Sequence, residues 1–212
     1  MPTLIQWQTT WQTLGAPQAP IFTELYQALI SKYSENHRHY HNLQHLTECL
    51  EKFAELRHLA VNPAEIELAL WFHDAIYDPV RHDNEQLSAE WAKASSLAAG
   101  VNPAIAGRVF QLIMATRHLD EASDADTNIL LDCDLAILGA NPKHFFEYER
   151  QIHQEYAFVP EAIFRQKRAE ILQRFLAQPA IFNTVLFVER YEQQARINLQ
   201  QAMERLCPMS LN

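Results

Sequence analysis

The chain has 212 residues, of which 48% are hydrophobic and 20% are charged, and these proportions exclude a disordered chain and indicate one large or two small globular domains. Its net charge of −9 argues against broad nucleic-acid binding, which relies on many Lys and Arg contacts to phosphates. Only four glycines occur, and Ala, Leu, Glu and Gln recur throughout, so we expect an all-α fold.

The cysteines and the N-terminal stretch indicate the compartment. Cys49, Cys133 and Cys207 are odd in number and widely spaced, which is typical of a reducing cytoplasm and not of a disulfide framework. Residues 1–15 lack the basic and apolar regions of a signal peptide. No apolar run approaches the roughly 20 residues that span a bilayer. We therefore expect a cytoplasmic protein with no membrane or nucleic-acid partner.

Eight to ten helices are predicted along the chain, with no low-complexity linker between them, so we expect a single domain over residues 1–212. Asn-Pro pairs mark three of the starts, and Gly100 and Gly139 mark two of the ends. Glu65 occupies the capping-box position of the third helix. The predicted ranges are 20–30, 40–58, 63–77, 84–99, 104–116, 127–138, 143–156, 160–176 and 180–206, the last being long enough to bend.

A His-Asp pair, His73-Asp74, stands within the apolar pattern of the third predicted helix. Neighbouring side chains on a helix point about 100° apart, so both reach one point only if that point lies between their directions. A metal ion is the usual object at such a point. The alternative is a core histidine bonded to a backbone carbonyl beside a solvated aspartate.

The second predicted helix carries His41 and His45, which four-residue spacing would place on one face about one turn apart. Arg38, three residues before His41, would share that face if the helix starts early. We interpret the nearby His37 and His39 as a solvated helix start, and the same interpretation is open for the pair.

The sixth predicted helix places Asp132 and Asp134 in an apolar stretch. Burying an unpaired carboxylate is costly, so at least one of them needs a cation, a cap or a metal. Asp132 suits the first turn of the helix, whereas Asp134 lies deeper. Together His45, His73, Asp74 and Asp134 supply two imidazoles and two carboxylates, a set that suits Mn²⁺, Fe²⁺, Co²⁺, Ni²⁺ or Zn²⁺ and leaves positions for water and substrate. No Cys-x-x-Cys spacing indicates a structural zinc site.

The order His … His-Asp … Asp on successive helices resembles the HD superfamily of metal-dependent phosphohydrolases, over roughly residues 36–140. The strings at 40–45 (Tyr-His-Asn-Leu-Gln-His), 73–78 and 132–135 are similar to an uncharacterised bacterial branch described as predicted HD phosphohydrolases. The first string also resembles the metal-site motif of cyclic-nucleotide phosphodiesterases, in which the second His binds metal and the first donates a proton to the leaving group.

The resemblance implies an HD-domain-like helical bundle and a divalent metal (Mn, Fe, Co, Ni, Zn or Mg) held by His45, His73, Asp74 and Asp134, with Asp134 chosen over Asp132. It implies hydrolysis of a phosphate ester, with a small nucleotide or a related phosphorylated metabolite as the substrate. Asp74 would then orient the attacking water and accept its proton, and His41 would protonate the leaving oxygen. The residues expected to contact substrate are Arg38, Asn84, Glu85, Arg117 and His118.

Departures from the family pattern keep alternatives open. Where 5′-deoxynucleotidases of the superfamily have a Glu, this chain has Tyr77, and only His82 and His118 are available for a second metal. His118 could instead satisfy the last carbonyls of a helix, and Asn84-Glu85 could be plain capping. The alternative functions are an HD-type di-iron oxygenase and a non-catalytic nucleotide-binding or sensing module. Residues 141–206 have no motif and are interpreted as scaffold, with a homodimer as one option.

Overall fold

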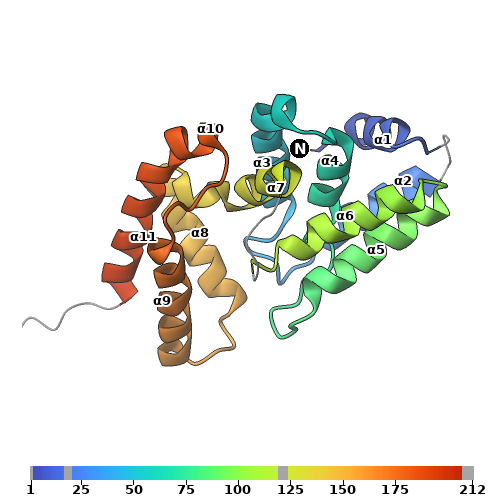
Figure 1. Cartoon of the computed structure of the whole chain (residues 1–212). Coiled ribbons are helices and arrows are strands. Elements are labelled where there is room, and N and C mark those ends of the chain that lie inside the picture. The colour runs from blue at the N-terminus through green and yellow to red at the C-terminus, as the bar shows by residue number, and fades with distance from the viewer. Residues whose placement is uncertain (1, 17–20, 119–123, 207–212) are drawn as a thin grey trace, which may run out of the picture. The chain divides into compact units, whose positions relative to one another are not determined.

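The computed structural model describes residues 2–16, 21–118 and 124–206, in which every regular element is helical and no strand occurs (Figure 1). The predicted all-α class is therefore confirmed. The chain divides into two compact units, Met1–Asp134 and Leu135–Asn212. The helices of the first unit are α1 (Leu4–Thr13), α2 (Ile21–Tyr33), α3 (Leu43–Leu56), α4 (Pro63–Phe72), α5 (Asn84–Ala98), α6 (Pro103–Ala115) and, running one residue beyond it, α7 (Ala125–Leu135).

The first helix, α1, was not predicted from the sequence, because the stretch before Gly15 was interpreted only as polar. Thr3 caps it by accepting a hydrogen bond from the Gln6 backbone N–H at 3.2 Å. Trp7 and Trp11, one turn apart, are completely buried, and the Trp7 indole donates to the Phe22 carbonyl at 2.8 Å. The two tryptophans therefore anchor α1 to the core of the first unit.

The centre of the first unit is α4, which packs against α1, α3, α5 and α6. Every residue from Ala64 to Phe72 is buried, so the helix has no solvent face. Its two acidic residues are matched by arginines from neighbouring segments: Arg108 bonds to Glu65 at 2.5 and 2.7 Å, and Arg57 bonds to Glu67 at 2.5 Å. Glu65 thus holds α6 against α4 and does not complete the predicted capping box.

The predicted helix starts are confirmed at all three Asn-Pro pairs, although the caps differ. Asn102 and Asn141 accept hydrogen bonds from the backbone N–H of the second or third helical residue. Asn62 instead donates its side-chain amide to Asp126. The Asp126 carboxylate also accepts from the backbone N–H groups of Val61 and Asn62, at 2.7 and 2.9 Å, and so joins α7 to the start of α4.

Helices α5 and α6 lie side by side as a hairpin, shown in green in Figure 1. The turn between them requires Gly100, whose φ of 80° lies in the left-handed region that glycine tolerates best. This confirms the predicted end of α5. The expected start of the first predicted helix at Pro20 lies outside the described residues.

The second unit contains α8 (Pro142–Glu155), α9 (Glu161–Ala177), α10 (Val185–Phe187) and α11 (Gln193–Leu206). A π-helical turn, Val188–Glu192, joins α10 to α11, and residues 180–184 precede α10 without helix, so the single helix predicted over 180–206 is partly wrong. Within this unit the buried Asn198 amide donates to the carbonyls of Leu138 and Ala140, both at 2.8 Å.

Gly139 ends a 3₁₀ turn, Ala136–Gly139, that follows α7. The sequence predicted that the sixth helix ends at Gly139, and the φ of this glycine is not positive, so the end is not a left-handed one. A Cβ atom placed on Gly139 would lie 2.6 Å from the Cβ and 2.9 Å from the backbone oxygen of Tyr191. Close backbone approach, and not turn geometry, requires glycine at this position. None of the helices in the described ranges is both long and apolar enough to cross a membrane.

Candidate metal centre

The His73-Asp74 pair lies at the C-terminal end of α4 and not within a helix. The helix ends at Phe72, five residues before the predicted end at Tyr77, and the Ala75 N–H bonds to the Phe72 carbonyl at 2.9 Å in the turn that follows. His73 is the C-cap residue and keeps helical dihedral angles, φ −54° and ψ −39°, so the pair stands at the point where the helix ends. Both side chains reach the same point.

The second pair of predicted residues, His41 and His45, flanks the start of α3. Asn42 is the N-cap and accepts from the Gln44 N–H at 2.8 Å, so the helix begins at Leu43. The expectation that His41 and His45 share a helix face is therefore wrong, since His41 precedes the helix. The two rings nevertheless meet edge to face, with their centroids 5.8 Å apart.

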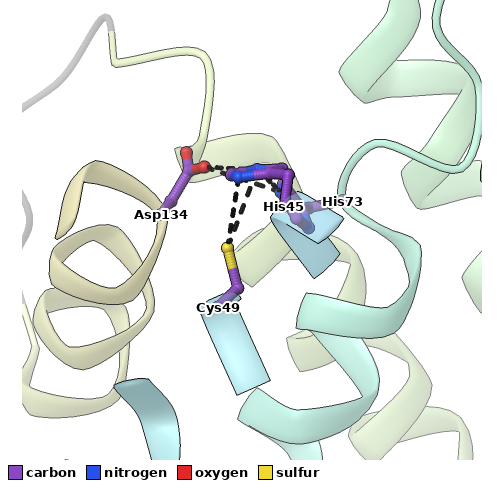
Figure 2. Close-up of side chains that lie close together, drawn as sticks. All are labelled: His45, Cys49, His73 and Asp134. Atoms are coloured by element: carbon purple, nitrogen blue, oxygen red, sulfur yellow. Dashed lines mark hydrogen bonds and ion pairs between the residues drawn. The ribbon is translucent and has the colours of Figure 1, made fainter. Parts of the chain in front are cut away.

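A buried cluster of possible metal ligands lies between α3, α4 and α7, all within the first unit. It comprises His45, Cys49, His73 and Asp134, whose donor atoms all lie within 4.8 Å of one another. Figure 2 shows the Asp134 carboxylate and the Cys49 sulfur reaching the two imidazoles from different sides. It is the one cluster of this kind in the described part of the chain, and it could hold a metal ion.

Asp74 belongs beside this cluster as well, by its distances to the imidazoles. Its Oδ2 lies 3.2 Å from His73 Nε2 and 3.4 Å from His45 Nε2. Asp134 Oδ1 lies 3.5 and 3.3 Å from the same two atoms, which are themselves 3.0 Å apart. The four predicted ligands, His45, His73, Asp74 and Asp134, thus point two nitrogens and two oxygens at one small space.

These separations suit a divalent ion. Metal–N and metal–O bonds of about 2.0–2.2 Å at angles of 90–110° separate neighbouring ligand atoms by roughly 2.8–3.6 Å. The five measured separations, from 3.0 to 3.5 Å, all fall in that range. The residues present therefore fit a metal, and nitrogen and oxygen donors together favour a borderline first-row ion.

Cys49, which the sequence analysis did not consider as a ligand, is less well placed than Asp74. Its sulfur lies 3.6 Å from Nε2 and 3.7 Å from Nδ1 of His45. Nearly equal distances put the sulfur midway between the two ring nitrogens, away from the direction in which the Nε2 lone pair points. Cys49 thus packs against the His45 ring, one helical turn away, while Asp74 brings a carboxylate oxygen to the two imidazoles.

The exposure of the side chains shows from which side the cluster opens. His45 and His73 are 3% and 1% exposed, whereas Asp74 and Asp134 are 17% and 16% exposed and His118 is 30% exposed. His73 is fixed from behind, because its Nδ1–H donates to the Leu70 carbonyl at 2.8 Å and leaves Nε2 free to accept. Water and solutes therefore reach the cluster from the carboxylate side.

Burial and charge act in opposite directions on the pKa values in the cluster. Burial lowers the pKa of His73, but the Asp74 charge, Tyr33 and the bonds to both carboxylates raise it well above its usual value. Burial likewise lowers the pKa of His45, but the charges of Cys49 and Tyr40 and the bonds to Asp134 and Asp74 raise it well above the ordinary value. The surroundings of both rings thus favour their protonated forms when no ion is bound.

The carboxylates shift in the complementary direction. Burial raises the pKa of Asp74, but the charges of His73 and His41 and the bonds to the two buried imidazoles hold it well below its usual range. Burial also raises the pKa of Asp134, and bonds to His118, His45 and His73 lower it well below the ordinary value. Both carboxylates are therefore ionised and available as ligands at neutral pH.

His118 lies at the edge of the cluster. Its Nε2 is 3.3 Å from Asp134 Oδ2, the oxygen that does not face the two buried histidines. Its φ of 51° is unusual for a residue with a side chain and suggests that the surrounding structure holds it there. The expectation that His118 only caps the end of α6 is thus incomplete, because its ring also contacts a cluster residue.

Other residues expected to contact substrate bond to the backbone instead. Arg38 has no exposed side-chain surface, and its guanidinium donates to the carbonyls of Asp74, Ala75 and His41. Asn84 bonds to both the N–H and the carbonyl of Asp78, at 3.1 and 2.9 Å. The predicted contact of Arg38 with substrate does not agree with this arrangement, because its guanidinium has no exposed surface, whereas the contact of half-buried Asn84 stays a prediction.

The remaining predicted residues differ in exposure. Arg117 is exposed, and its side chain forms no hydrogen bond or ion pair with the described residues. Glu85 is partly exposed in the first turn of α5. Asp132 is completely buried and is not part of the cluster.

Comparison of the chain with protein-family models, with curated proteins and with solved structures finds no match.

Proposed function

We propose that the protein is a metal-dependent hydrolase of phosphate esters of the HD type, acting on a small nucleotide or a related phosphorylated metabolite. The observation that supports this most is the arrangement of His45, His73, Asp74 and Asp134 around one space, at separations of 3.0–3.5 Å, with His41 beside it. The motif order His … His-Asp … Asp that resembles the superfamily coincides with this cluster.

In the proposed reaction, a bound divalent ion supplies Lewis acidity, which acidifies water and neutralises charge on the phosphoryl oxygen. Asp74 is partly exposed, so its carboxylate can orient an incoming water and accept its proton. Arg117, exposed next to His118, is the described cation that we assign to the substrate phosphate. The role fits an always-charged side chain that no acidic group among the described residues neutralises.

His41 is proposed as the proton donor to the leaving oxygen. Its ring is only partly buried and stacks on Tyr77 with centroids 4.2 Å apart, which fixes its orientation. The ring lies beside the cluster, with its centroid 5.8 Å from that of His45. From this side it would give a proton to the leaving oxygen.

The first test is metal content together with phosphate release from a panel of nucleotides and other phosphate esters, with Mn²⁺, Co²⁺, Ni²⁺ or Mg²⁺. We expect about one ion per chain and turnover that depends on it. His73→Ala should lose both, whereas His39→Ala, an exposed neighbour, should lose neither. Tight nucleotide binding without turnover would instead support a sensing module. Two irons and oxygen consumption would support the oxygenase.

The second test separates the role of His41 from that of the ligands. His41→Ala should retain the ion but lose roughly 10²–10⁴ in rate, the usual contribution of a positioned proton donor. The loss should be smaller for a p-nitrophenyl ester, whose leaving group needs little protonation. Equal losses on good and poor leaving groups would show that His41 holds substrate and that another group supplies the proton. His39→Ala is again the matched control.

A further inference from the structure

The guanidinium of Arg38 occupies the space between the two segments that carry His41 and Asp74. One terminal nitrogen donates to the carbonyls of His41 and Asp74, at 3.1 and 2.6 Å, and the other donates to the Ala75 carbonyl at 3.0 Å. Nε donates to the Glu35 carboxylate at 3.1 Å. An arginine has five N–H donors, and the protein uses nearly all of them here.

The group is also enclosed on its flat faces. The central carbon of the guanidinium lies 5.3 Å from the centroid of the Tyr33 ring and 5.6 Å from that of Tyr77. The side chain has no exposed surface, so it cannot meet a substrate phosphate without leaving this pocket. The Glu35 carboxylate, 31% exposed, balances its charge from the solvent side.

The accepting carbonyls explain why an arginine is needed. His41 precedes α3, and Asp74 and Ala75 follow α4, so none of the three lies inside a helix. Carbonyl oxygens just outside a helix need hydrogen-bond donors from elsewhere in the chain. A side chain that donates to several of them fixes the path of the backbone there. One planar group therefore sets the position of the His41 backbone relative to that of Asp74.

We infer that Arg38 is a positioning residue that holds the proton donor His41 in register with the metal ligand Asp74. The inference rests on the proposed function for the role of His41, but the linkage of the two segments does not. Arg38 touches neither the substrate nor the ion in this arrangement. Its effect on the reaction would pass through the backbone of the two residues it connects.

The test uses Arg38→Ala in the full-length, metal-loaded protein, with and without added guanidinium ion at low millimolar concentration. Supporting shells around metal sites typically contribute 10–100-fold in metal affinity or activity. We expect kcat to fall by that factor, KM to change little and Mn²⁺ affinity to weaken. Added guanidinium, but not urea, should restore kcat and Mn²⁺ affinity. Arg108→Ala is the matched control, because Arg108 also forms a two-bonded pair, with Glu65, but is 51% exposed.

Several outcomes would overturn the inference. A raised KM with unchanged kcat would mean that Arg38 contacts substrate, and losses equal to those of Arg108→Ala would mean a general effect on stability. If Arg38→Ala does not fold, Arg38→Lys answers the same question, because one ammonium cannot bind all four acceptors at once. If the wild-type protein hydrolyses no phosphate ester, the proposed function fails, and the Mn²⁺ affinity with its guanidinium rescue still tests the linkage.

Discussion

Metal affinity should depend steeply on pH, because a metal and protons compete for the same two imidazoles. The pKa values of His45 and His73 are raised well above the ordinary value, which favours protonated rings when no ion is bound. Coordination requires neutral imidazoles. The carboxylates of Asp74 and Asp134 release no protons when the metal binds, because their pKa values lie well below the usual range and both are already ionised. Binding one ion should therefore release up to two protons.

The magnitude follows from that count. Two protons released per ion change the apparent Kd by up to 100-fold per pH unit, or about 2.7 kcal/mol, within the range where both rings are protonated. The sign is fixed by the raised pKa values: acid favours the protonated rings and weakens metal binding. In the metal-free protein the imidazolium–carboxylate attraction is complete below the unfolded pKa of about 6.5 and is lost as pH rises through the raised folded values. Bound metal should remove this alkaline loss of stability.

Titration calorimetry with Mn²⁺ or Zn²⁺ in two buffers of different ionisation enthalpy measures the protons released, and a competing chelator measures Kd across pH 6–8. His153→Gln is a control, because that histidine is 50% exposed and pairs with Glu161, so its loss should leave the proton count unchanged. A release near zero together with an affinity that is flat with pH would refute the reasoning. The buried imidazoles would then be neutral before the metal arrives, or the ion would bind elsewhere.

Two predictions concern stability alone, and both are measured by thermal or denaturant unfolding. Gly139→Ala should destabilise the protein by about 1–3 kcal/mol, because the new methyl group would overlap the Tyr191 backbone. Gly107→Ala is its control, with open space around the new group and a gain in helix propensity of up to about 1 kcal/mol expected. Asp126→Asn should cost about 1–3 kcal/mol, because an amide nitrogen would face backbone donors ahead of α4, while metal binding remains intact. An unchanged midpoint for either destabilising variant would contradict the packing or bonding described above.

Helix ends could be predicted from the sequence where the residues that set them lie within one turn of the end. The Asn-Pro starts and the Gly100 turn depend on residues within one helical turn, so they could be predicted from the sequence. The end of α4 at Phe72 could not, because apolar residues continue beyond it to Tyr77 and the helix stops for tertiary reasons. The helix at α1 was missed, although Thr3 and the spacing of Trp7 and Trp11 could have indicated it.

The candidate site shows the same division. The four metal-ligand candidates followed from motif strings, but the argument that His41 and His45 share a helix face did not hold, because His41 precedes α3. Whether a polar side chain faces solvent or a backbone carbonyl depends on distant segments, which is why Arg38 was misjudged. Cys49, four residues after His45, could have been identified as a neighbour of the cluster from helical spacing alone.

The complete burial of α4 has a consequence for how the metal centre moves. Local opening requires surface that can separate from its surroundings at low cost, and α4 has none between Ala64 and Phe72. The backbone that leads into His73 should therefore exchange its amide hydrogens only through global unfolding. The carboxylate side, formed by Asp74 after the helix and Asp134 on α7, is the more exposed part of the cluster. Metal ions would then enter and leave past the two carboxylates, so metal can exchange while α4 stays buried.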